Sequence, residues 1–165
     1  MIEIRETGIN DLEDVRRLWA DGDVMLFVGF PEGLHKTDEE MLEWYRRVDR
    51  RRPDINHYSV FEDGVYCGES YYRIDREHGN SAAMDVKLFG TARGRGIAAA
   101  ALSHAIREAF DYGAETVWVD PVPANAKAIA LYERLGFKKA ERPGYLITDG
   151  EAPGSVYMEL RKERS

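Results

Sequence analysis

The chain has 165 residues, of which 44% are hydrophobic and 32% are charged, and its formal net charge is −7. This length and composition are typical of one globular domain, spanning 1–165, with a core of its own. The acidic balance argues against a nucleic-acid partner, which calls for an excess of Lys and Arg. No apolar run approaches the roughly 20 residues that cross a bilayer, so we expect no membrane partner.

Cysteine and histidine usage narrows the chemistry further. Cys67 is the only cysteine, which excludes an intrachain disulfide and fits a cytoplasmic protein. The first residues, MIEIRETGIND, lack the apolar stretch of a secretory signal. The histidines are scattered without metal-ligand spacing, so the sequence predicts no metal; they are His35, His57, His78 and His104.

The amino-terminal part predicts a strand, a helix and a loop. Alternating apolar and charged residues predict a strand over 2–6. Asn10 and Glu13 have the spacing of a helix capping box, and apolar residues at helical spacing follow. Residues 21–36 lack periodicity and contain three glycines and a proline, which predicts a loop.

A second helix should begin at the capping box of Thr37 and Glu40 and end before Pro53. Its carboxyl-terminal half carries a basic cluster, which is typical of a solvated helix face. The alternative is a patch that binds a ligand. The cluster comprises Arg46, Arg47, Arg50, Arg51 and Arg52.

Three strands are predicted next. The β-prone runs 57–62 and 65–74 flank Asp63-Gly64, which is a strong signal for a two-residue hairpin turn. A third strand is expected over 82–89. These three strands should form a meander.

The period then changes to that of a helix over 97–110, with Gly113 as its carboxyl-terminal cap. A short buried strand is expected over 116–119, and a helix over 125–135 that Gly136 stops. Residues 138–147 and 155–160 predict a closing hairpin. The element order predicts a mixed α/β fold in which only the strand–helix–strand unit over 82–119 is a parallel crossover.

The most informative segment is the loop Arg93-Gly94-Arg95-Gly96-Ile97-Ala98, which lies between a strand and an apolar helix. Glycines allow a tight turn with exposed N–H groups, and the helix start adds about half a positive charge. This loop suits a pyrophosphate, and its arginines add further charge.

Three interpretations of this loop are open. The glycines could make a plain turn. They could belong to a dinucleotide fingerprint, Gly94-x-Gly96-x-x-Ala99, with Asp120 near the end of the next strand. A dinucleotide loop follows its strand closely, however, whereas residues 90–93 intervene here. The third interpretation is a coenzyme A site.

The segment 125–137, NAKAIALYERLGF, favours the third interpretation. Together with the loop it resembles the GCN5-related N-acetyltransferase (GNAT) superfamily, in which an Arg/Gln-x-x-Gly-x-Gly/Ala loop binds the pyrophosphate of acetyl-CoA. Here that loop corresponds to Arg93, Gly96 and Ala98. The superfamily's second motif is matched by Asn125, Ala128, Leu131, Tyr132, Gly136 and Phe137.

The resemblance, which is strong over 82–137, implies a mostly antiparallel sheet of about seven strands flanked by about four helices. It also implies acetyl-CoA as co-substrate. The residues it assigns to acetyl-CoA are Lys87 and Leu88 as backbone donors, Arg93, Gly94, Arg95, Gly96, Ile97, Ala98, Asn125, Ala128 and Tyr132.

A narrower resemblance concerns the substrate. The run Asp120-Pro121-Val122-Pro123-Ala124-Asn125 is similar to the entry to this helix in aminoglycoside N-acetyltransferases, where such carboxylates hold a polycationic sugar or act as the base. Asp85 and the closing hairpin around Asp149 also have counterparts there. On this resemblance, Asp85, Asp120 and Asp149 are the expected substrate ligands.

Acetyl transfer needs a base for the substrate ammonium, whose pKa is near 10.4, and a proton donor for the leaving thiolate. We expect Tyr132 as the acid, with a core aromatic as the alternative. Candidate bases are Asp85, Asp120 and Glu69. Asp85 could instead face solvent, Asp120 could cap a turn, and Asp149 could only make a turn.

The sequence therefore predicts an acetyl-CoA-dependent N-acetyltransferase acting on a primary amine of a small cationic, aminoglycoside-like or polyamine-like molecule. Alternatives are a protein N-terminal or side-chain amine acetyltransferase and a non-catalytic acyl-CoA-binding regulatory module. The loop over 21–36 and the closing hairpin are candidate surfaces for a homodimer. We expect Trp19, Phe27 and Phe30 to line the acceptor site. The alternative is that they pack in the core.

Overall fold

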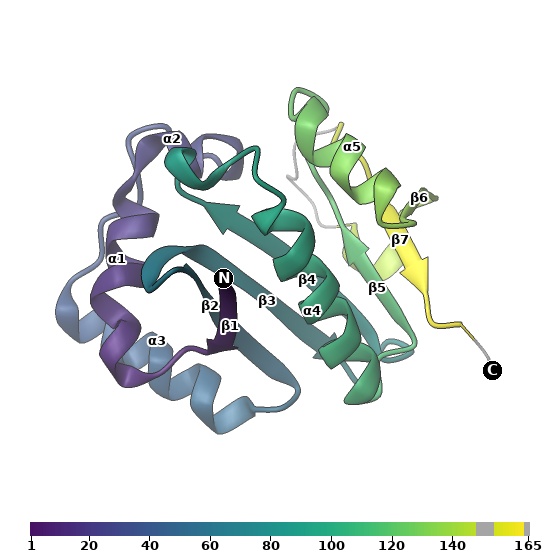
Figure 1. Ribbon diagram of the computed structural model, residues 1–165. Helices are drawn as coiled ribbons and strands as arrows, with labels where there is room; N and C mark the ends of the chain where they lie inside the picture. Colours follow the sequence, from purple (N-terminus) through teal and green to yellow (C-terminus); the bar gives the residue numbers. More distant parts are fainter. Residues whose placement is uncertain (148–153, 164–165) are drawn as a thin grey trace.

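A seven-stranded mixed sheet, in the order β1-β2-β3-β4-β5-β7-β6, runs through the computed structural model, which describes residues 1–147 and 154–163 (Figure 1). The strands are β1 (Ile2–Glu6), β2 (Ile55–Glu62), β3 (Val65–Asp75), β4 (Ser81–Leu88), β5 (Thr116–Val119), β6 (Lys138–Lys139) and β7 (Met158–Arg161). The α-helices within the described residues are α1 (Leu12–Ala20), α2 (Gly22–Met25), α3 (Asp38–Arg51), α4 (Ile97–Asp111) and α5 (Ala126–Arg134).

The pairing of the strands confirms the predicted fold class. The pair β4 and β5 is parallel, and the other five neighbouring pairs are antiparallel. Helix α4 makes the crossover between the parallel strands, because a parallel pair cannot be joined by a tight turn. The structure has five α-helices in its described part, against about four expected.

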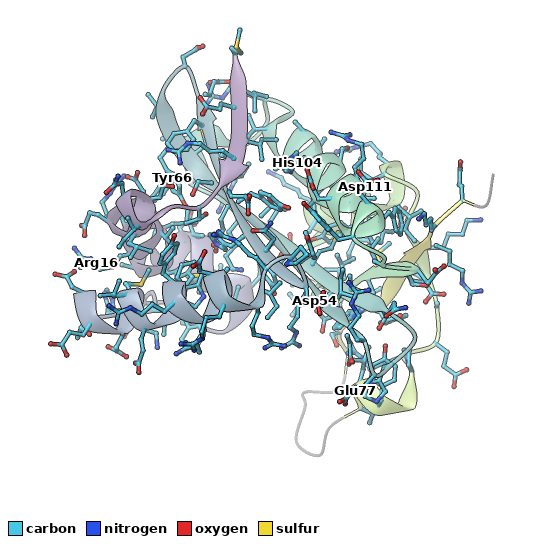
Figure 2. The ribbon with its side chains drawn as sticks, turned by 90° about the horizontal axis from the view of Figure 1, so that it is seen from below. Arg16, Asp54, Tyr66, Glu77, His104 and Asp111 are labelled. Carbon is cyan, nitrogen blue, oxygen red and sulfur yellow. The ribbon has the colours of Figure 1, made fainter. Side chains whose placement is uncertain are left out.

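Adjacent residues of β2 show how the helices divide between the two faces of the sheet. The ring of Tyr58 packs edge-on against His104 of α4, with centroids 4.6 Å apart. The ring of His57 packs edge-on against Trp44 of α3, at 4.8 Å. Since successive side chains of a strand point to opposite faces, α3 and α4 cover opposite faces. Figure 2 shows Arg16 of α1 and His104 of α4 on the two sides.

The β2–β3 hairpin contains a bulge. Asp63 and Gly64 both have positive φ, as the predicted two-residue turn requires. Beyond the turn, Phe61 pairs with Tyr66 but Val60 pairs with Gly68, so that one residue of β3 has no partner. Past this bulge the register is shifted by one residue. Side chains of β3 therefore lie on the face opposite to the one that an unbroken hairpin would give them.

We expect Gly68→Ala to destabilise the fold by about 1–3 kcal/mol, as overpacking does. A Cβ at this position would lie 2.0 Å from the Lys87 carbonyl oxygen of the neighbouring strand, so backbone would have to move. Urea unfolding would measure the loss. The matched control is Gly144→Ala, where an added Cβ meets nothing within 4 Å. Equal effects of the two substitutions would contradict a tight contact at Gly68.

Two predictions for the amino-terminal part are wrong. The loop predicted over 21–36 contains α2, because the Asp21 carboxylate caps it by accepting from the Asp23 and Val24 N–H groups. Asn10 does not cap α1. The chain enters α1 through a 3-10 turn, in which the buried Asp11 carboxylate accepts from the Gly8 N–H at 2.8 Å.

The closing hairpin is also shorter than predicted. Its first strand covers only β6, and residues 144–146 form a 3-10 turn instead. Pro143 has no N–H to donate to a strand ladder. Beyond it, the ring of Tyr145 stacks on His78 with centroids 4.1 Å apart, which directs this segment towards the β3–β4 turn.

Candidate functional site

The central parallel strands separate part of the way along the sheet. Pairing of β4 with β5 covers residues 81–83, whereas β4 continues to Leu88. We call the space beyond residue 83 the β4–β5 seam. Strand β5 ends at Val119, and α5 follows after a short turn. Asp85 of β4 lies close enough to Tyr132 of α5 for its charge to act on the tyrosine hydroxyl.

Backbone groups of β4 point into this seam. The Phe89 N–H donates to the Cys67 carbonyl at 2.9 Å. In an antiparallel pair the N–H groups of alternate residues face the same neighbour. The N–H of Leu88 therefore faces away from β3, towards the seam, and that of Lys87 faces β3. Of the two predicted backbone donors, Leu88 has the orientation that a ligand in the seam needs.

The glycine loop leads from this seam into α4. Gly94 and Gly96 both have positive φ, near 80°, and a Cβ at either position would meet nothing within 4 Å. Within the described residues, the N–H groups of Gly94, Arg95 and Gly96 have no hydrogen-bond partner. The buried Ile97 anchors the first turn of α4 behind them. Free donors, open space and a helix start are what a pyrophosphate requires.

The arginines of the loop are held by the protein itself. Arg93 donates to the Leu88 carbonyl at 3.2 Å and lies 3.4 Å from the Asp23 carboxylate at the start of α2. Arg95 pairs with the Glu62 carboxylate. Both guanidinium groups remain about half exposed. They fix the shape of the loop, and the paired carboxylates offset part of their charge.

Tyr132 of α5 lies on the α4 side of the sheet. It is 4% exposed and packs against the ring of Phe137 with centroids 5.6 Å apart. Within the described residues its hydroxyl has no hydrogen-bond partner. Burial, reinforced by the negative charge of Asp85, raises the pKa of this hydroxyl well above its usual value. Tyr132 therefore stays protonated at neutral pH and is available as a proton donor.

Asn125 and Ala128 have local roles in α5. The Asn125 side chain caps the helix by accepting from the Ala128 N–H at 3.3 Å. Ala128 packs against the main core at the start of the helix. Both residues fix the first turn of α5, and neither side chain brings a charge.

Glu69 is the most enclosed of the predicted carboxylates, at 2% exposed. The Trp19 indole N–H donates to it at 2.7 Å, His57 Nε2 contacts its other oxygen, and the Lys87 ammonium lies 3.9 Å away. Burial alone would raise the pKa of Glu69, but the charge and hydrogen bond of His57, followed by Lys87 and Trp19, lower it to about 2. A carboxylate so stabilised is a weak base.

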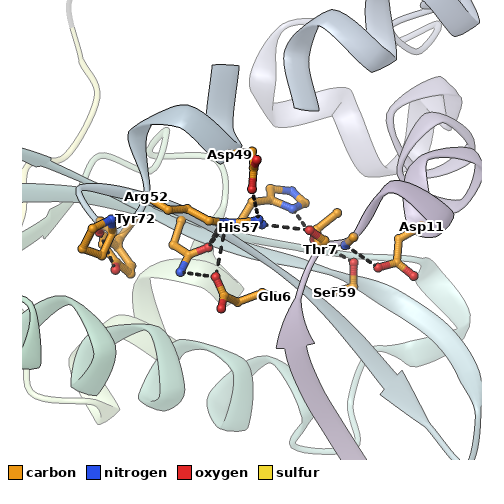
Figure 3. A network of polar contacts seen from close by, with 11 residues as sticks. Glu6, Thr7, Asp11, Asp49, Arg52, His57, Ser59 and Tyr72 are labelled. Atoms are coloured by element: carbon orange, nitrogen blue, oxygen red, sulfur yellow. Dashed lines mark hydrogen bonds and ion pairs between the residues drawn. The ribbon is translucent and has the colours of Figure 1, made fainter. Parts of the chain in front are cut away.

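His57 joins Glu69 to a polar chain that the sequence did not reveal. Its Nδ1 lies 2.6 Å from the Thr7 hydroxyl, which lies 2.8 Å from the Ser59 hydroxyl (Figure 3). Arg52 donates to the Thr7 carbonyl at 2.8 Å and fixes this end of β1. These contacts hold the imidazole in place, whereas its contact with Glu69 depends on the shifted register of β3.

Asp85 lies on the same face as Glu69 but is more accessible, with its side chain 32% exposed. It accepts from the Lys87 ammonium and from the Val86 N–H, both at 2.8 Å. Burial alone would lower the pKa of Lys87, but the charges of Asp85 and Glu69 raise it, so that the ammonium stays charged. Asp85 is a reachable carboxylate at the seam.

The remaining predicted carboxylates lie farther out. Asp120 follows β5, is 48% exposed on its side chain, and lies 3.6 Å from Arg142. Asp149 falls outside the described residues.

No cluster of His, Cys, Asp and Glu suited to a metal ion occurs within the described ranges. Over the same ranges, no helix has the length and apolar character to span a bilayer.

A cavity of about 580 Å³ opens on the α3 face, next to Glu69. Its apolar wall includes Trp19 and Phe30, two of the three predicted wall residues, whereas Phe27 is 45% exposed and lies outside the lining. Tyr71 and Lys87 form the side of the cavity nearest the seam. The cavity is of the size that small-molecule sites have.

Comparison with known proteins relates this arrangement to a family. The family model described as "Acetyltransferase (GNAT) family" matches residues 14–137. The [ribosomal protein bS18]-alanine N-acetyltransferase of Escherichia coli (strain K12) is 45% identical over 58 residues, which cover 34% of this chain and 39% of that protein. The match to this curated relative therefore spans less than half of its length.

Solved structures share the fold over almost the whole chain. The spermidine N-acetyltransferase from Vibrio cholerae, in complex with CoA and spermine, has a TM-score of 0.79 at 17% identity, covering 97% of this chain and 95% of that one. YncA of Salmonella typhimurium, a putative acetyltransferase with its cofactor acetyl-CoA, has a TM-score of 0.78 at 20% identity, covering 100% and 96%. With the family model matched over 14–137, the chain belongs to the acetyltransferase (GNAT) family.

Proposed function

We propose that this protein transfers the acetyl group of acetyl-CoA to a primary amine by direct attack in a ternary complex. The observation that carries the proposal is the set of N–H groups over Gly94, Arg95 and Gly96 that have no partner among the described residues, after a strand whose pairing with β5 ends at residue 83. Acetyl-CoA supplies the activated acetyl thioester. The glycine loop would hold its pyrophosphate.

The chain's own groups suit the remaining steps. The Leu88 N–H, which faces the seam, would donate to the thioester oxygen where negative charge develops. Asp85 would take the proton of the acceptor ammonium as its nitrogen attacks the acetyl carbon. Tyr132, kept protonated by its raised pKa, would donate a proton to the departing thiolate. Glu69, with a lowered pKa, would orient Lys87 and Trp19.

Two acceptor classes are open within this proposal, and one other function competes with it. A small cationic acceptor, polyamine-like or aminoglycoside-like, fits the acidic net charge. An alanine of ribosomal protein bS18 is the acceptor named for the relative from Escherichia coli, which favours a protein amine. A non-catalytic acyl-CoA-binding module would retain the loop without the chemistry. Release of free thiol that requires both acetyl-CoA and an amine would support the enzyme. Tight binding of acetyl-CoA without turnover of any amine would contradict it.

We expect Asp85→Asn to lower kcat/KM for the amine by about 10²- to 10⁴-fold, the range typical of a lost general base. The amide keeps the shape of the side chain and cannot accept the proton. Steady-state kinetics with saturating acetyl-CoA would measure the effect, and the fold would be checked by thermal unfolding. The comparison variant is Asp120→Asn, since Asp120 is exposed at the end of β5. A larger loss in that variant would assign the base to Asp120 instead.

A further inference from the structure

The 580 Å³ cavity differs in charge from the rest of the protein. The chain has 30 acidic and 23 basic residues, yet five basic side chains and one carboxylate line the cavity. The carboxylate is Glu69, which is enclosed with His57 and Lys87. The basic residues other than Lys87 are Arg47, Arg50, Arg51 and Arg73.

These four arginines are not neutralised by the protein. Within the described residues none of them has an ion pair or a hydrogen bond, and all four are exposed. The neighbouring Arg52, by contrast, pairs with Asp49 at 3.2 Å and Glu6 at 3.3 Å. Arg52 therefore has a structural role, whereas the N–H groups of the four cavity arginines are available to a ligand.

The four arginines lie at one end of the cavity, and Tyr71, next to Asp85, lies at the other. Three come from the last two turns of α3, just before β2 begins at Ile55. Ile55 pairs with Arg73, which places the fourth at the same end. On β3, Tyr71 comes two residues before Arg73 and lies on the same face. The two residues are therefore about 7 Å apart along the strand. Tyr71 lies opposite Asp85.

Between these ends the wall is apolar and aromatic. It is lined by Trp19, Phe30, Leu34, Trp44 and Val48. The cavity therefore has Lys87, which contacts Asp85, at its seam end, an apolar middle, and a group of guanidinium donors at the far end. Guanidinium groups bind carboxylates by paired, charge-assisted hydrogen bonds.

We propose that the acceptor is an amino carboxylate, a small molecule with one amine and one carboxylate. This inference rests on the proposed acetyl transfer. Its amine lies beside Asp85 and its carboxylate lies among the arginines of α3 and Arg73. A polycation would place positive charge against these arginines. A second cavity, of about 630 Å³, does carry Asp14, Asp21 and Asp23, but neither Tyr71 nor Lys87, the two residues that adjoin Asp85, lines it.

The test is a thiol-release assay with three sets of amines: amino carboxylates with two to six carbons between the groups, their primary amides, and polyamines with an aminoglycoside. We expect kcat/KM to be about 10- to 100-fold higher for the best amino carboxylate than for its amide, the value of one or two hydrogen bonds to a charged group. Arg73→Gln and the double variant Arg50→Gln/Arg51→Gln should lower the ratio of the two kcat/KM values towards 1.

Arg46→Gln is the matched control, because Arg46 lies on the same helix, is exposed, and does not line the cavity. It should keep the full preference. Activity with the amide shows that each variant is folded. Faster turnover of the polyamine or the aminoglycoside would contradict the amino carboxylate as the acceptor while still supporting acetyl transfer. Acetyl-CoA that neither binds nor reacts with any amine would remove the acetyltransferase itself.

Discussion

Tyr132→Phe should lower kcat by about 10²- to 10⁴-fold while the affinity for acetyl-CoA changes little. The hydroxyl has no hydrogen-bond partner within the described residues, so its removal leaves no orphaned group. The ring contact with Phe137 is unaffected. What is lost is the proton for the departing thiolate. Steady-state kinetics and calorimetric titration with CoA would separate the two effects.

The control for this variant is Tyr66→Phe. Tyr66 is also buried, and its hydroxyl also lacks a hydrogen-bond partner among the described residues. It packs between Phe61 and Phe89, away from α5. This substitution should leave kcat unchanged within about twofold, since it removes a hydroxyl that has no assigned step. If Tyr132→Phe proves as active as Tyr66→Phe, the thiolate is protonated by another group.

Glu69→Gln should lower the free energy of unfolding by about 3 kcal/mol at pH 7, as expected when one partner of a buried charged group is removed. The folded pKa of Glu69 is about 2, below its ordinary value of 4.5. Its ionised form therefore stabilises the fold fully above about pH 4.5, and this contribution is lost as the pH falls towards 2. Urea unfolding between pH 2 and pH 7 would show the difference between the wild type and the variant shrinking with acid.

Glu43→Gln provides the matched comparison, because Glu43 is exposed on α3 and takes part in no ion pair within the described residues. Its stability should follow that of the wild type at every pH to within about 0.5 kcal/mol. A constant difference between the wild type and Glu69→Gln across the whole pH range would show that Glu69 is not held ionised by His57 and Lys87.

The acid sensitivity and the proposed chemistry have the same structural origin. Glu69 is enclosed by groups from α1, β2 and β4, through Trp19, His57 and Lys87. A change that loosens this cluster would alter both the stability of the sheet and the position of Lys87. Since Lys87 in turn holds Asp85 at 2.8 Å, we infer that Glu69 acts on the reaction through position.

The glycine loop, the helix of Tyr132 and most elements follow from local sequence. Asn125 caps α5 and Gly136 ends it with positive φ, as the sequence predicted. Thr37 and Glu40 form their capping box. Such features depend on residues within one or two turns of one another, so the pattern along the chain is sufficient to predict them. Asp21 caps α2 by the same kind of local contact.

The register of β3 could not be predicted in this way. Counting back from the Asp63-Gly64 turn would pair His57 with Ser70 and place Glu69 on the opposite face. The bulge at residue 67 pairs His57 with Tyr71 instead and brings Glu69 to its side of the sheet. A bulge depends on packing against the neighbouring strand, where Gly68 leaves no room for a Cβ.

The sequence by itself predicted the mixed fold, the acetyl-CoA loop and the role of Tyr132, because each prediction depends on spacing within a short segment. Only the tertiary structure decided which charges meet. The arginines of α3 have the pattern of a solvated helix face, and they become a cavity wall because the sheet places Arg73 and Ile55 beneath them. Such contacts join residues far apart in the chain, and their energies depend on burial and pairing that local patterns do not contain.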